Sequence, residues 1–312
     1  MKPREGILLL LVCLCWGLHM VIIKWVTGYV SPLTYVAFRM PILAVLLAPL
    51  LRWYPGQMHR VIIAGACFGG LNYAFMFTGI SLTSASIGSV LAESYVVFAT
   101  LFSIVFLGEK VGWKRGAGIG AALIGVLIIA TGDNEATGSK NLPLGALLII
   151  CGTMAEAVGA LFVKKIDGVK PLALLAWMAL VGSFVSFVPA ALFAEDHFAW
   201  ISDGSFGPVG LSLLYSIVLA SVFGHGTYYF ILQRVPLSIV APSGLLITLF
   251  AVFFGVLLLG EQLTGRIILG ALLVVAGVGV VLVRGSRPDR KQVIAEVGLH
   301  EEEPEKKLEG SS

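Results

Sequence analysis

Charged residues are scarce in this sequence. Asp, Glu, Lys and Arg make up only 12% of its 312 residues, whereas 58% are hydrophobic, and the mean hydropathy is +0.95. Soluble globular proteins carry about 25% charged residues, so an ordinary soluble protein is excluded, and the high apolar content excludes a disordered chain. A polytopic membrane protein in a lipid bilayer remains, because about 20 apolar residues span the bilayer core.

The common catalytic motifs are also missing. The sequence has no P-loop G-x-x-x-x-G-K-[ST], no H-E-x-x-H and no G-x-S-x-G, and these would mark nucleotide hydrolysis and hydrolytic enzymes. We therefore expect no enzyme, no catalytic residue, no cofactor and no metal. A net charge of only +3 does not indicate nucleic-acid binding. The cysteines all lie in apolar runs, which favours buried thiols over disulfides or metal ligands: Cys13, Cys15, Cys67 and Cys151.

Long apolar runs dominate what is present. They must form helices, because an isolated strand cannot satisfy its backbone hydrogen bonds in lipid. The predicted fold is therefore all-α, a polytopic membrane protein with ten transmembrane helices. Bounded by Pro, Gly or charge, the spans are 6–27, 32–51, 60–81, 84–107, 112–131, 143–164, 171–194, 207–232, 237–259 and 265–284.

The distribution of basic residues predicts the orientation. Ten spans place both termini on the same side, and that side carries seventeen Lys and Arg residues. The opposite side carries three, Lys24, Lys140 and Arg266. Since cytoplasmic loops are rich in Lys and Arg, we expect both termini in the cytoplasm.

The sequence also repeats itself at an offset of 152 residues. Leu107-Gly108-Glu109 aligns with Leu259-Gly260-Glu261, and Gly118 and Gly125 align with Gly270 and Gly277. Five spans per copy force the second copy to enter the membrane inverted, which is typical of transporters. We predict two inverted five-helix repeats, 1–131 and 132–284. Residues 285–312 are predicted to be a disordered cytoplasmic tail, whose last five residues resemble a cloning remnant.

Several short patterns resemble the drug/metabolite transporter superfamily, and within it the EamA branch of ten-helix exporters. They are Trp16-Gly17, Lys24, Pro32, Arg39, Thr83-Ser84-Ala85-Ser86 and the doubled Leu-Gly-Glu. The resemblance covers about residues 6–284. It implies a carrier in a bacterial inner membrane that exports small metabolites, first of all amino acids, aromatic or otherwise apolar, as in exporters of the YddG type. Carriers of nucleotide sugars or drugs, and a passive solute channel, are the alternatives.

Full charges inside the spans are the first candidates for a binding site. Arg39, Glu93 and Glu156 are the only ones well within the predicted helices, where each costs at least a few kcal/mol without a partner or a wet cavity. For Arg39 we favour a structural role, with the side chain reaching the outer surface, over anion binding. A central carboxylate such as Glu93 or Glu156 could receive a substrate ammonium or carry a coupling proton. Glu156, beside small residues, fits helix packing equally well.

Polar and aromatic stripes supply the other candidates. Ser86, Ser89, Glu93, Thr100 and Ser103 share one face of a helix, which favours a wet cavity over interhelical hydrogen bonding. Tyr95 and Trp177 are weaker candidates, because Tyr95 projects away from that stripe. The predicted substrate-binding residues are Trp16, His19, Asn72, Tyr73, Ser89, Glu93, Glu156, His225, Tyr228 and Tyr229. We expect a small-molecule substrate, a coupling proton as a candidate partner, and a monomer or weak dimer.

Overall fold

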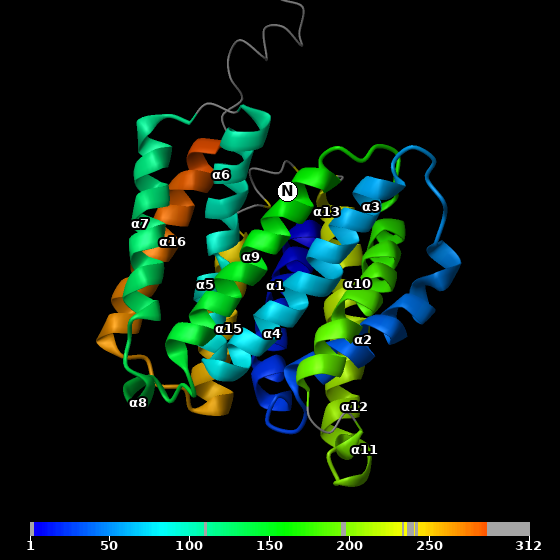
Figure 1. Cartoon of the computed structure of the whole chain (residues 1–312). Helices are drawn as coiled ribbons and strands as arrows, with labels where there is room; N and C mark the ends of the chain where they lie inside the picture. Colours follow the sequence, from blue (N-terminus) through cyan, green and yellow to red (C-terminus); the bar gives the residue numbers. More distant parts are fainter. Residues whose placement is uncertain are drawn as a thin grey trace, which may run out of the picture.

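The computed structural model describes residues 3–108, 111–194, 198–232, 234–235, 240 and 243–285. Every regular element in these ranges is a helix, which confirms the all-α prediction. The helices run between an upper end, where α1 begins, and a lower end, where α1 ends (Figure 1). Residues 286–312, nearly all of the predicted tail, lie outside the described residues.

The helices follow the predicted spans to within a few residues. Nine helical segments among the described residues are long and apolar enough to cross a membrane, and α15 is a shorter apolar helix of 17 residues. The elements are α1 (Pro3–Val26), α2 (Pro32–Leu47), η1 (Ala48–Leu50), α3 (Met58–Gly65), η2 (Ala66–Asn72), α4 (Tyr73–Leu82), α5 (Ala85–Ala92), α6 (Ser94–Leu107), α7 (Trp113–Ala130), α8 (Asn134–Thr137), α9 (Leu142–Val163), α10 (Pro171–Phe193), α11 (Ala199–Ser202), α12 (Phe206–Leu214), η3 (Tyr215–His225), α13 (Gly226–Leu232), α15 (Ser243–Leu259) and α16 (Gly265–Gly285).

Among the described residues, three of the predicted spans are interrupted, which the apolar pattern did not predict. The third contains the π-helical segment η2, and the eighth contains the longer π-helical segment η3. The fourth is divided at Glu93, which separates α5 from α6. A π-helical turn shifts every later side chain around the helix axis and is frequent at functional sites. All three interruptions therefore change which residues face the inside of the bundle.

Helices α7 and α16 pack closely side by side through paired glycines (Figure 1). A Cβ on Gly118 would lie 2.8 Å from the Gly277 carbonyl oxygen, and one on Gly125 would lie 2.6 Å from that of Gly270. Because Gly118 aligns with Gly270 and Gly125 with Gly277, these contacts are reciprocal, as expected of equivalent helices in inverted copies. The boundary between the repeats, at residues 131 and 132, stays a prediction.

Two charged side chains hold the turn between α4 and α5 at the lower end. Lys24 Nζ donates hydrogen bonds to the carbonyl oxygens of Ser81, at 3.0 Å, and Thr83, at 2.5 Å. The Glu261 carboxylate accepts from the backbone N–H groups of Ala85, at 2.6 Å, and Ser86, at 2.9 Å. A cation thus meets a helix C-terminus and an anion meets a helix N-terminus, which are the favourable pairings. The aligned Glu109 lies outside the described residues.

Candidate functional site

A cavity of about 350 Å³ lies in the middle of the bundle. Side chains from α1, α2, η2, α4, α5, α6, α9, η3, α13 and α15 line it, together with Glu93 between α5 and α6. Small-molecule sites have volumes of about 300–1,000 Å³ and combine apolar walls with a few polar groups. The cavity therefore has the size and the lining of a site for a small amphipathic solute.

The structure brings nine of the ten predicted site residues to this cavity. They are Trp16, His19, Asn72, Tyr73, Ser89, Glu93, Glu156, His225 and Tyr228. The tenth, Tyr229, belongs to α13, but its side chain lies outside the described residues. The shared location makes a common role possible, and substrate binding by these residues remains a prediction.

An aromatic cluster forms the wall where α1 meets η3 and α13. The Trp16 ring lies 5.1 Å from the His225 ring and 5.4 Å from the Tyr228 ring, between centroids. Trp16 Nε1 donates to the Ala220 carbonyl oxygen at 2.8 Å, and His225 Nδ1 lies 3.2 Å from the same oxygen. A carbonyl can only accept, so the His225 contact is a hydrogen bond when Nδ1 carries the proton. Gly224 is required here, because a Cβ at this position would collide with the Trp16 indole.

The two carboxylates of the cavity are each held by one neutral donor. Thr248 Oγ1 donates to Glu93 Oε1 at 2.8 Å, and Asn72 Nδ2 donates to Glu156 Oε2 at 3.1 Å. Within the described part of the chain, the second oxygen of each has no hydrogen-bond donor from the protein. Carboxylates normally accept several hydrogen bonds, so both retain capacity for a solute cation, a proton or water. The described residues include no group of three or more His, Cys, Asp or Glu side chains placed to hold a metal.

The prediction that the Arg39 side chain reaches the outer surface is wrong. Its side chain is only 1% exposed and lies in the cavity wall. Nε donates to Ser216 Oγ at 2.6 Å, and Nη2 donates to Ser221 Oγ at 2.8 Å. These serines belong to η3, so contacts with a distant helix hold the guanidinium inside, and its aliphatic stem does not extend along α2 to the surface.

The predicted polar stripe reaches the cavity at only two of its positions. Ser89 and Glu93 line it, whereas Ser86, Thr100 and Ser103 do not. Ser86 lies at the lower end, and Thr100 accepts a hydrogen bond from Arg115 at 3.4 Å. The stripe requires one continuous helix, but the helix is divided at Glu93, so the residues after Glu93 do not continue on the same face.

The same break explains why Tyr95 faces the cavity. Tyr95 lines the cavity, although it was expected to project away from Glu93. The other weak candidate, Trp177, is not part of the cavity lining and donates to the Arg52 carbonyl oxygen at 2.9 Å. Thr248 was missed altogether. Its signal was available, because Ser243 and Thr248 are the only polar residues in the apolar helix α15.

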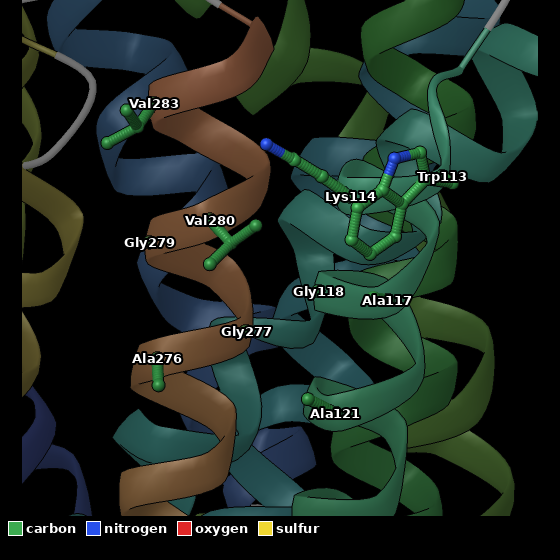
Figure 2. Close-up of a pocket in the computed structure, with 10 residues that line it drawn as sticks. All are labelled: Trp113, Lys114, Ala117, Gly118, Ala121, Ala276, Gly277, Gly279, Val280 and Val283. Atoms are coloured by element: carbon green, nitrogen blue, oxygen red, sulfur yellow. The ribbon is translucent and has the colours of Figure 1, made fainter.

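A second, larger hollow of about 700 Å³ lies between α7 and α16, and it is a less suitable site. Figure 2 shows Trp113 and Lys114 on α7 opposite Val280 and Val283 on α16. Glycine, alanine and valine make up most of the lining, and Lys114 is its one charged residue. Such a groove results from the close glycine packing of two helices and offers little to orient a solute.

Known proteins resemble this chain over most of its length. The sequence pattern of the EamA-like transporter family matches residues 4–131 and 143–283. The chain is 28% identical to the "Probable amino-acid metabolite efflux pump" of Escherichia coli K12 over 284 residues, which cover 89% of this chain and 94% of the relative. The protein with the same name from Salmonella typhimurium LT2 is equally similar, and an "Uncharacterized transporter" of Archaeoglobus fulgidus is 24% identical over 89% of this chain. A crystal structure with 17% identity matches 92% of this chain and 100% of its own with a TM-score of 0.52, which shows a shared fold.

Proposed function

Because the chain belongs to the EamA-like transporter family, we propose that it is a secondary transporter that exports amino acids or related amphipathic metabolites through the central cavity. The observation that carries the proposal is the cavity itself, where two carboxylates and an aromatic cluster surround about 350 Å³. A free amino acid presents an ammonium, a carboxylate and a side chain. Each of these chemical features has a counterpart in the lining.

The carboxylates have the central role in this mechanism. Glu93 and Glu156 each accept one hydrogen bond from the described part of the chain, so each can receive a substrate ammonium or a coupling proton. Alternating access follows from rocking of the two repeats about the cavity, as in other inverted-repeat carriers. The upper end faces the cytoplasm of a bacterial inner membrane, in agreement with the positive-inside rule.

Counterflow in proteoliposomes tests the proposal. Liposomes loaded with unlabelled L-phenylalanine should take up radiolabelled phenylalanine faster than empty ones, and uptake should saturate with concentration. A carrier exchanges solute across its central site and so shows this stimulation. Linear uptake without stimulation would indicate a passive channel, and no uptake of any amino acid would refute the proposed substrate class.

A Glu93→Gln variant tests the role of the central carboxylate. Gln keeps a similar shape but removes the negative charge, so phenylalanine uptake should fall by about tenfold or more, because a hydrogen bond to a charged group contributes about 1.5–3 kcal/mol. Glu135→Gln is a suitable control, since Glu135 is an exposed residue of the short lower-end helix α8. Transport by Glu93→Gln that equals wild type at every pH would exclude Glu93 from the mechanism.

A further inference from the structure

Arg39 is the most deeply buried charged side chain in the cavity lining. It is 1% exposed, and its guanidinium carbon lies 4.3 Å from the centre of the Tyr73 ring and 5.9 Å from that of Phe77. Aromatic rings attract a cation but do not neutralise it. A charge buried at this depth in a membrane protein is costly and is normally paired or functional.

No carboxylate in the described part of the chain pairs with Arg39. Its hydrogen-bond acceptors are the hydroxyls of Ser216 and Ser221, and Nη1 has only the Met40 sulfur at 3.9 Å. Thioether sulfur is a weak acceptor. The Nη1 group and the second hydrogen of Nη2 are therefore still able to donate, in the planar arrangement that suits a carboxylate.

The nearest explanation, an ion pair with a cavity glutamate, is not what the structure contains. Glu93 accepts from Thr248 and Glu156 accepts from Asn72, so neither carboxylate is used to neutralise Arg39. The cavity thus contains one guanidinium and two carboxyl groups that are not paired with one another. Separate poles of opposite sign match a solute that itself carries both charges.

We propose that Arg39 is the anion-binding pole of the solute site and receives the carboxylate of a zwitterionic substrate. Ser216 and Ser221 hold the guanidinium in place, and the hydroxyl of Ser216 also lies 2.7 Å from His19 Nε2. This inference rests on the proposed function, and it narrows the substrate class. Amino acids are accepted, and the corresponding amines, which lack the carboxylate, are discriminated against.

Three ligands of the same aromatic body test this assignment. L-Phenylalanine carries both charges, 3-phenylpropionate lacks the ammonium, and phenethylamine lacks the carboxylate. Binding to purified full-length protein is measured by equilibrium dialysis, and the same compounds are tested as inhibitors of phenylalanine counterflow. Wild type should bind phenylalanine about tenfold or more tightly than phenethylamine, given the strength of hydrogen bonds to charged groups.

The variant Arg39→Gln should lose about tenfold or more of its affinity for phenylalanine and for 3-phenylpropionate, and keep its affinity for phenethylamine. Arg39→Lys keeps the charge without the planar fork, so its loss should be smaller. Arg115→Gln is the control, because Arg115 does not line the cavity and should behave like wild type. A purely structural role for Arg39 would change all three affinities together.

The outcomes separate the two proposals. If wild type binds phenethylamine as tightly as phenylalanine, or if folded Arg39→Gln discriminates like wild type, the assignment of Arg39 is wrong while amino-acid export can still hold. If neither Arg39 variant folds, the wild-type preference between the three ligands decides. If no amino acid is transported at all, the proposed function fails, and dialysis of 3-phenylpropionate against wild type and Arg39→Gln still decides whether Arg39 binds carboxylates.

Discussion

The Glu261 carboxylate supports the N-terminus of a helix in the other half of the chain, which leads to a quantitative prediction. It accepts from the N–H groups of Ala85 and Ser86, while Ser84 Oγ accepts from the N–H of Ile87 at 3.1 Å. The first three N–H groups of α5 thus all donate to side-chain oxygens. Ala85, Ser86 and Ile87 are 0–1% exposed, so the bonds form in a buried environment.

Removing this carboxylate should lower stability by an amount that depends on the substitute. Glu261→Ala leaves two buried N–H groups without their acceptor, at about 1–3 kcal/mol each. Because Glu261 itself is only half-buried, water can partly replace it, and we expect about 2–3 kcal/mol in total. Glu261→Gln keeps one carbonyl acceptor but presents an amide donor to the second N–H, so about 1–2 kcal/mol is expected.

Thermal stability in detergent measures the effect. Samples are heated, and the fraction that remains monodisperse is followed by fluorescence-detected size exclusion. The midpoint should fall by several degrees for Glu261→Ala and by less for Glu261→Gln, while the exposed control Glu135→Gln stays near wild type. A Glu261→Ala midpoint equal to that of the control would refute the idea that this contact stabilises α5.

Two further predictions concern packing and the aromatic wall. A methyl group on Gly69 would collide with the Met178 carbonyl oxygen. Gly69→Ala should therefore lower the free energy of unfolding by about 1–3 kcal/mol and reduce the yield of folded protein. Gly116→Ala has no neighbour within 4 Å and should be tolerated in the same expression assay. Trp16→Phe removes the hydrogen bond to the Ala220 carbonyl oxygen, which should lower the free energy of unfolding by about 1 kcal/mol. The same variant should bind phenylalanine more weakly in equilibrium dialysis, and unchanged binding would exclude the indole from the site.

Much of the architecture could be predicted because lipid imposes simple rules on a chain. The apolar runs predicted helices whose observed limits differ by a few residues, and the glycines aligned at an offset of 152 lie in reciprocal contact between α7 and α16. The interruptions at η2, Glu93 and η3 could not be predicted in this way. An interrupted span has the same composition as a straight one, and its irregular backbone becomes favourable only through contacts with other helices.

Some residues of the candidate site could likewise be predicted from the sequence, and others could not. Trp16, Glu93, Glu156 and His225 were conspicuous as polar or aromatic groups within apolar helices, since each is costly there without a partner or a cavity. A helical projection places Tyr95 away from Glu93, and that projection fails where the helix is divided. The error for Arg39 has a different cause, because its two serine acceptors lie on a helix 177 and 182 residues away in sequence.

Hydropathy and charge along the chain are enough to predict a membrane protein with helices of alternating direction, and to identify the few polar groups inside its spans. Hydropathy and the cost of a buried charge act on each segment independently, so they can be evaluated along the chain. Which of those groups share a cavity follows from the packing of the helices. The same packing places Arg39 against two serines of η3 and gives Glu93 and Glu156 neutral donors of their own. Such pairings depend on the packing of helices from both halves, which no single segment contains.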